Sequence, residues 1–156
     1  MTISNLPAVN QPSAIVYRYG DMFQQYDRGV MFVPVNCKGV MGAGLALKVA
    51  QRNPGLELLY RDLCRTNFLG IGRPYLMRTV DGTIISLFPT KDDWRNPSKL
   101  EYIETGFQYF IKDNKPVIPL HIPKLGCGLG GLEWDDVHAL IKKYFADYPQ
   151  PVYVYI

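Results

Sequence analysis

Apolar and polar positions along the chain follow two different periods, and the changes between them predict the elements of the fold. Continuous apolar runs rich in valine and isoleucine are typical of strands covered on both faces. Apolar residues that recur at intervals of three and four predict helices with one buried face. The runs predict strands at 14–21, 29–36, 75–80, 83–88, 116–122 and 151–156, and the recurring pattern predicts helices at 45–53, 55–66, 97–113 and 133–148.

Short local signals mark where these elements begin and turn. Asp81-Gly82 separates two β-rich runs and predicts a hairpin with a type I′ turn, because this pair tolerates positive φ angles. Ser98 and Glu101 have the spacing of a capping box at the start of a helix. Strands that alternate with helices, interrupted by one hairpin, predict a three-layer α/β/α fold whose central sheet is mixed and mostly parallel, with about six strands.

Length and charge are those of a single soluble domain. The chain has 156 residues, enough to bury one core. Residues 1–13 contain two prolines and several polar residues, and they are expected to form a flexible N-terminal arm before one domain at 14–156. A net charge of +3 fits a polyanionic partner and an ordinary solvated surface equally well.

The cysteines and the hydropathy pattern predict a cytoplasmic protein. Cys37, Cys64 and Cys127 have neither CxxC nor CxxxH spacing, so the sequence predicts no disulfide framework, no metal site and no cofactor. No apolar run reaches the roughly 18 residues of a membrane span, and the N-terminus lacks the pattern of a signal peptide. We therefore expect no membrane partner, and a monomer, because the predicted elements make up a whole domain.

Two glycine-rich segments are the strongest functional signal. Residues 36–50 and 125–134 each follow a predicted strand and lead into a predicted helix. Glycine lets the backbone approach a ligand closely, and the free N–H groups of a helix start bind anions. Two such loops favour a ligand with two phosphates, although tight turns alone explain many glycine loops. Neither loop has the GxxxxGK[ST] spacing, and the first does not fit GxGxxG, which disfavours ATP hydrolysis and dinucleotide redox chemistry.

Four segments together resemble the signature motifs of the macro domain family. They are GDMF at 20–23, VPVNCKGVMGAGLAL at 33–47, PTKDDWRNPSKLEYIE at 89–104 and IPKLGCGLGGLEW at 122–134. The resemblance spans about 14–148 and is strongest to the DNA ADP-ribosyl glycohydrolase antitoxins of the DarG type, with the human terminal ADP-ribose glycohydrolase a more distant neighbour. It implies a macro fold, ADP-ribose and ADP-ribosylated DNA as partners, and an antitoxin-like role.

The resemblance also implies which residues bind ADP-ribose. Asp21 would accept a hydrogen bond from the adenine amino group, since a carboxylate is an acceptor only; on sequence alone a turn aspartate is nearly as good an interpretation. Asn36 would bind the distal ribose, with a hydrogen bond at the helix entry as the alternative. The remaining implied contacts are Met22, Gly42, Ala43, Gly44, Leu45, Gly126, Cys127, Gly128, Leu129, Gly130 and Gly131.

Lys91 is the candidate catalytic residue. It follows the strand at 83–88 closely and matches the lysine that glycohydrolases of this branch need, where it would attack or polarise the anomeric carbon of the distal ribose. Without the resemblance, a surface lysine in a polar loop is the better interpretation. Trp94 and Arg95 would stack on, or hold the phosphate of, a nucleic acid, unless Trp94 simply anchors its loop. Lys38 is a further basic residue that would face phosphate.

The predicted function is removal of ADP-ribose from a thymidine-type base of modified DNA, with release of ADP-ribose. The terminal ADP-ribose glycohydrolase has an aspartate where this chain has Gly130, whereas the DarG branch also has glycine, which favours DNA as the substrate. A phosphatase acting on ADP-ribose 1″-phosphate and a non-catalytic ADP-ribose reader are the alternatives. His121 ends a strand before the second loop and is expected near the ligand, and His138 is expected on the surface or in the core.

Overall fold

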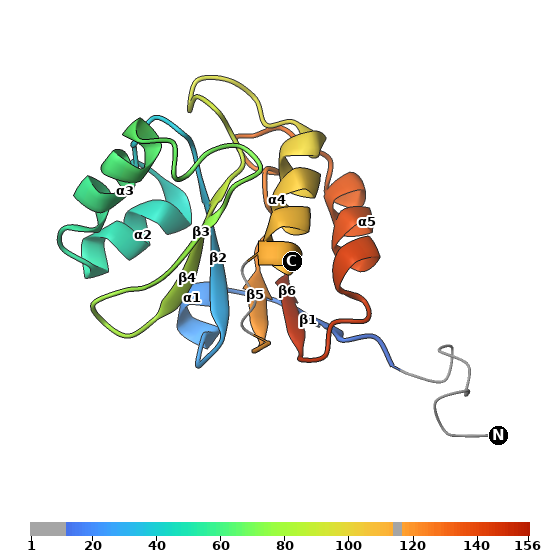
Figure 1. The fold of residues 1–156 in the computed structure, drawn as a ribbon. Coiled ribbons are helices and arrows are strands. Elements are labelled where there is room, and N and C mark those ends of the chain that lie inside the picture. The colour runs from blue at the N-terminus through green and yellow to red at the C-terminus, as the bar shows by residue number, and fades with distance from the viewer. Residues whose placement is uncertain (1–11, 114–116) are drawn as a thin grey trace.

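The computed structural model describes residues 12–113 and 117–156, which form a six-stranded sheet between two layers of helices (Figure 1). The strands are β1 (Ile15–Arg18), β2 (Val30–Val35), β3 (Tyr75–Arg78), β4 (Ile84–Pro89), β5 (Leu120–Ile122) and β6 (Val152–Tyr155). The helices are α1 (Met22–Gln25), α2 (Gly44–Arg52), α3 (Leu56–Arg65), α4 (Leu100–Asp113) and α5 (Trp134–Phe145). Most of the predicted arm at 1–13, and the first residue of the strand predicted at 116–122, lie outside the described residues.

The order of the strands brings loops that are distant in the sequence to one edge of the sheet. The order is β1-β6-β5-β2-β4-β3, and each neighbouring pair is parallel except the antiparallel β3 and β4. This confirms the predicted mixed, mostly parallel sheet. β2 lies between β5 and β4, so the loops that follow these three strands leave the sheet side by side. In parallel sheets, this carboxyl edge is where ligands bind.

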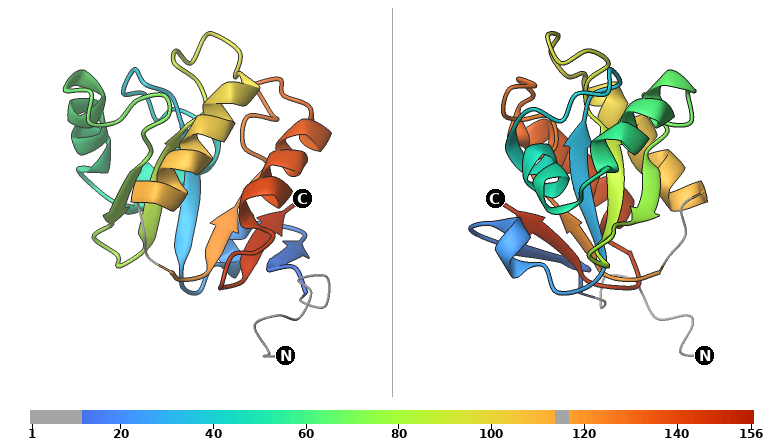
Figure 2. Two further views of the ribbon diagram at one scale, coloured as in Figure 1. Left: turned by 45° about the vertical axis from the view of Figure 1, so that its right-hand side comes forward. Right: turned by 90° about the vertical axis from the view of Figure 1, so that its left-hand side faces the viewer.

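Strand β2 packs against both helical layers, one on each face of the sheet. Alternate residues of a strand point to opposite faces of the sheet. Val30 and Phe32 join the core beneath α4 and α5, whereas Met31, Val33 and Val35 join the core beneath α2 and α3. All five side chains are buried. The apolar run therefore lacks alternation because both faces of the strand are covered, as Figure 2 shows from two sides.

The hairpin between β3 and β4 forms, but its turn is not the predicted type I′. Thr79 donates its N–H to the Thr83 carbonyl (2.8 Å), and Gly82 donates to the Thr79 carbonyl (3.0 Å), so three residues make up the loop. Gly82 has a positive φ of 89°, whereas Asp81 does not have a positive φ. A type I′ turn needs positive φ at both Asp81 and Gly82, and a three-residue loop needs it only at the glycine.

The predicted capping box at the start of α4 is also wrong. The helix begins at Leu100, which makes Lys99 the residue that precedes it. The Ser98 hydroxyl is buried and has no hydrogen-bond partner among the described residues, while the Ser98 N–H donates to the Gly130 carbonyl (2.9 Å). Contact with a distant loop thus determines the position of Ser98. The spacing of residues within the helix does not predict this contact.

His121 belongs to the core of the sheet and does not line the predicted ligand site. Its Nε2 lies 2.8 Å from the Arg28 carbonyl, which can only accept, so Nε2 carries the proton. Its Nδ1 therefore accepts from the Tyr155 hydroxyl at 2.7 Å. Burial is the main cause that lowers the pKa of His121 below its ordinary value. Protonation of His121 would put a hydrogen on Nδ1, where it would face the hydrogen that the Tyr155 hydroxyl donates to the neutral ring.

We expect this histidine to make the fold less stable in mild acid. Because its pKa is lower in the folded state, its contribution is complete above the unfolded pKa of about 6.5 and is lost as the pH falls toward the folded value. The free energy of unfolding, measured by urea titration between pH 8 and pH 5, should fall by at most about 1.4 kcal/mol per pH unit from this group. The dependence of the free energy of unfolding on pH should become weaker in His121→Gln. An unchanged slope in that variant would contradict this explanation.

Candidate active site

A cleft of about 540 Å³ lies at the carboxyl edge of the sheet, between the loops that follow β2, β4 and β5. It brings together most of the residues that the sequence predicted for the distal end of the ligand. The lining residues are Pro34, Val35, Asn36, Val40, Gly42, Ala43, Gly44, Ala46, Thr90, Lys91, Trp94, Gly126, Gly128, Leu129 and Gly130. Lys91 is the one ionisable side chain in this lining, as far as the described residues show.

A second hollow, also of about 540 Å³, adjoins the first and shares Gly44 with it. It is lined by Gly20, Asp21, Met22, Gly44, Leu45, Lys48, Pro123, Lys124, Tyr155 and Ile156. Asp21 was predicted from the sequence, but the short helix α1 that it caps was not. One Asp21 carboxylate oxygen accepts from the Phe23 N–H (2.8 Å) and the other lies 3.4 Å from Lys48 Nζ. The predicted adenine residue therefore lies in a separate hollow from Lys91.

Asn36 is buried and holds the first glycine loop in shape. Its Nδ2 donates to the Val40 carbonyl (2.8 Å), and its Oδ1 accepts from the Lys38 N–H (2.9 Å). The hydroxyl of Tyr60, on α3, donates to the Asn36 carbonyl (2.5 Å) and lies 2.9 Å from Oδ1. An amide nitrogen has two N–H groups, so one remains for a ligand in the cleft. No motif in the sequence indicates this contact of Tyr60 with Asn36.

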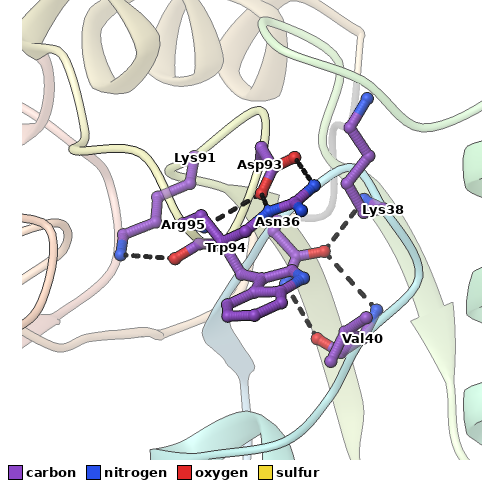
Figure 3. A network of polar contacts seen from close by, with 7 residues as sticks. All are labelled: Asn36, Lys38, Val40, Lys91, Asp93, Trp94 and Arg95. Atoms are coloured by element: carbon purple, nitrogen blue, oxygen red, sulfur yellow. Dashed lines mark hydrogen bonds and ion pairs between the residues drawn. The ribbon is translucent and has the colours of Figure 1, made fainter.

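The loop that carries Lys91 is joined to the loop that follows β2. Thr90 donates its N–H to the Val35 carbonyl (2.9 Å), and the Cys37 N–H donates to the Asp92 carbonyl (3.0 Å). The Lys91 ammonium donates to the Trp94 carbonyl at 3.3 Å (Figure 3). Lys91 and Asn36 therefore lie on neighbouring loops that two backbone hydrogen bonds connect.

Arg95 and Asp93 form a tight pair beside the cleft. The Arg95 guanidinium donates from Nε and from an amino nitrogen to the two carboxylate oxygens, at 3.0 and 2.7 Å (Figure 3). These hydrogen bonds hold the pKa of Asp93 well below its usual range. The guanidinium also lies 5.3 Å from the centre of the Trp94 ring. Arg95 does not line the cleft, and its predicted contact with nucleic acid stays a prediction.

Glycines of the two loops differ in whether the protein itself excludes a side chain. A β-carbon at Gly130 would lie 2.3 Å from Ser98 Oγ and 2.4 Å from the Gly126 carbonyl oxygen, so protein packing excludes a side chain there. Gly128, in the second loop, and Gly42, in the first, have ordinary φ angles, and a β-carbon would meet nothing within 4 Å at Gly128 and only Val40 at 3.6 Å at Gly42. Neither packing nor backbone conformation requires glycine at these two positions.

Other predicted residues lie outside the two hollows. Gly131 lines neither, and Cys127 packs against the core beneath α4 and α5, where burial raises the pKa of its thiol. The Lys38 side chain is exposed and points away from Lys91 (Figure 3). His138, on α5, forms a hydrogen bond of 2.6 Å between its Nε2 and the Tyr17 hydroxyl.

No group of three or more His, Cys, Asp and Glu side chains lies close enough to hold a metal ion in 12–113 and 117–156. Within the same ranges, no helix has the length and hydropathy needed to cross a membrane.

Fold and cleft define a class of protein: an α/β/α domain with a ligand cleft between glycine-rich loops. Its sheet and helices superpose on the macrodomain of Mycobacterium tuberculosis DarG with a TM-score of 0.75, at 33% identity, over 90% of this chain and 96% of that one. The macrodomain of Thermus aquaticus DarG superposes with a TM-score of 0.78, at 30% identity, over 91% of this chain and 99% of that one. The chain belongs to the macro domain family, and within that family it is related to the DarG DNA ADP-ribosyl glycohydrolases.

Sequence comparison gives the same relationship. The chain matches no family model. It is 36% identical to the DNA ADP-ribosyl transferase-DNA ADP-ribosyl glycohydrolase fusion protein of Thermosipho africanus, over 88% of this chain and 40% of that protein. The structure of Thermosipho africanus DarTG in complex with ADP-ribose gives a TM-score of 0.77. The DNA ADP-ribosyl glycohydrolase of Mycobacterium tuberculosis is 37% identical over 86% of this chain and 40% of its own length. The chain thus spans about two fifths of these curated relatives.

Proposed function

We propose that this chain binds ADP-ribose across the two adjoining hollows and removes it from a thymidine-type base of modified DNA. The observation that carries the proposal is Lys91, the one ionisable group among the described residues of a cleft lined by both glycine loops. The relationship to DNA ADP-ribosyl glycohydrolases, one of which has been seen with ADP-ribose, supports both the ligand and the reaction.

The backbone of the loops suits the diphosphate of this ligand. Gly42 and Gly128 line the cleft from the two loops and leave their backbone open to close approach. Backbone N–H groups at the start of a helix bind phosphate, and α2 begins at Gly44, in the middle of the lining. The ligand would then extend from Asp21, at the adenine end, to Asn36 and Lys91 at the distal ribose.

The reaction breaks the bond between C1″ of the distal ribose and a nitrogen of the base. Water supplies the hydroxyl that forms the new C1″–O bond, and the base nitrogen takes up the proton. The Lys91 amine would either attack C1″, forming a transient C1″–N bond that water then replaces, or act as a cation that polarises this centre. Both roles need Nζ in the cleft, where its contact with the Trp94 carbonyl holds the side chain.

The other two candidate functions make different demands on the cleft. A phosphatase for ADP-ribose 1″-phosphate needs a group that activates water, and in the described lining no carboxylate or imidazole accompanies Lys91. A reader needs no lysine at this position. Neither alternative accounts for an ionisable group placed where the leaving base would be attached.

Binding of ADP-ribose and turnover of two candidate substrates test the proposal. The purified chain should bind ADP-ribose in calorimetry and release it from a thymidine-ADP-ribosylated oligonucleotide, while ADP-ribose 1″-phosphate should be turned over far more slowly. Binding without release from the oligonucleotide would favour a reader. Rapid release of phosphate from ADP-ribose 1″-phosphate, unaffected by Lys91→Ala, would favour the phosphatase.

A further inference from the structure

Two large apolar side chains in the cleft are exposed to water and come from different loops. Trp94, in the loop between β4 and α4, is 51% exposed, and Leu129, in the loop between β5 and α5, is 88% exposed. The Leu129 value is the highest of any large apolar residue in the described chain. Both line the same cleft as Lys91. Apolar side chains gathered at a cleft usually become covered when a ligand binds.

Trp94 has a contact on its backbone and another on its ring, although half of it is exposed. Its carbonyl accepts from Lys91 Nζ, and its ring has the Arg95 guanidinium at 5.3 Å. Arg95 is itself held by two hydrogen bonds to the nearly buried Asp93 carboxylate. The exposed half of the ring presents a flat apolar surface in the cleft.

Leu129 is left almost entirely uncovered by the described residues. It lies between Gly128 and Gly130, and the other side of the cleft belongs to a different loop. Burying such a side chain is favourable because apolar surface is removed from water. Since the packing of the described residues leaves this surface to water, its burial is available to a ligand.

We infer that Trp94 and Leu129 are positioning residues that hold the nucleobase attached to ADP-ribose, and so place the C1″–N bond against Lys91. The inference rests on the proposed function. A nucleobase has two flat faces that stack on aromatic rings and pack on aliphatic groups. Free ADP-ribose carries only a hydroxyl at C1″ and has nothing there for these two side chains to hold. The pair therefore acts on the modified base and not on ADP-ribose itself.

The test compares Trp94→Ala and Leu129→Ala with wild type on two substrates, the thymidine-ADP-ribosylated oligonucleotide and the corresponding ADP-ribosylated nucleoside. We expect kcat/KM to fall about tenfold or more for Trp94→Ala, and about fivefold for Leu129→Ala, on both substrates. Trp94→Phe should recover most of the loss. The Kd for ADP-ribose should stay within about twofold of wild type. Leu58→Ala, which removes an exposed leucine from α3, is the matched control.

Four results would overturn the inference. Cleavage by both alanine variants at the wild-type rate, with Lys91→Ala inactive, would remove the base-holding role and leave the proposed function intact. An equal loss of ADP-ribose affinity would mean that the two residues bind ADP-ribose itself. A loss confined to the oligonucleotide would mean that they contact the DNA backbone. If wild type cleaves neither substrate, the proposed function fails and the inference with it.

Discussion

Lys91→Ala should lose cleavage of ADP-ribosylated DNA while it keeps its affinity for ADP-ribose. We expect kcat/KM to fall by about 10³-fold or more, because the variant removes the one ionisable group that the described residues bring to the cleft. The Kd for ADP-ribose should change by no more than about threefold, since the proposed diphosphate contacts come from backbone N–H groups. Single-turnover cleavage of the oligonucleotide and calorimetry with ADP-ribose measure the two quantities separately.

Two further variants make this result specific. Lys112→Ala removes the same charge from the exposed end of α4 and should cleave like wild type. Lys91→Arg keeps the charge, but a guanidinium cannot become a neutral nucleophile. Activity in the arginine variant would support a polarising role, and its loss would support attack by the amine. Wild-type cleavage by Lys91→Ala would remove this residue from the mechanism.

Gly130→Ala should destabilise the domain by about 2 kcal/mol or more, which is the second large effect we expect. The added carbon would lie 2.3 Å from Ser98 Oγ and 2.4 Å from the Gly126 carbonyl oxygen, so the second loop must move away from Ser98. That movement would break the hydrogen bond from the Ser98 N–H to the Gly130 carbonyl and alter the cleft. Urea unfolding measures the loss of stability, and calorimetry with ADP-ribose measures its consequence.

Gly128→Ala is the matched control in the same loop. A β-carbon there meets no protein atom within 4 Å and its φ is ordinary, so stability should stay within about 0.5 kcal/mol of wild type. Binding of ADP-ribose should still weaken, by about tenfold, because the carbon would occupy space proposed for the diphosphate. Unchanged affinity in this variant would mean that the ligand does not approach Gly128.

Gly130 is the position at which the resemblance implies an aspartate in the terminal ADP-ribose glycohydrolase. Gly130→Asp would put a larger side chain into the space between Ser98 and Gly126. Position 130 therefore has no room for an acidic partner to Lys91 without a different position for Ser98. A mechanism that relies on lysine alone fits the packing of the loops as well as the resemblance.

Much of the fold can be predicted from the sequence, because amphipathic helices and strands covered on both faces have recognisable patterns of apolar residues. The apolar run of β2, the amphipathic helix α4 and the mixed, mostly parallel character of the sheet were all predicted. The type I′ turn and the capping box were wrong, since each depends on a hydrogen-bond partner that local spacing does not specify. The short helix α1 was missed because four residues are too few to show a helical period.

The site was predictable where chemistry is carried by residue type, and less so where it depends on contact. Lys91, Asn36 and the two glycine loops do meet in one cleft, as the resemblance implied. Tyr60 holds Asn36 from a helix on another part of the chain, and Ser98 fixes the second loop; neither leaves a motif. His121 was expected near the ligand, but it is the middle residue of β5, where it pairs with Met31 of β2 and its side chain is buried.

The most direct test of the central claim is mass spectrometry of a thymidine-ADP-ribosylated oligonucleotide after incubation with the wild-type chain. We expect an unmodified strand and free ADP-ribose in equal amounts, with the thymine base still on the strand. A strand that keeps its full modification would contradict the proposed reaction. So would a strand that retains ribose phosphate, because the diphosphate and not the C1″–N bond would then have been cleaved.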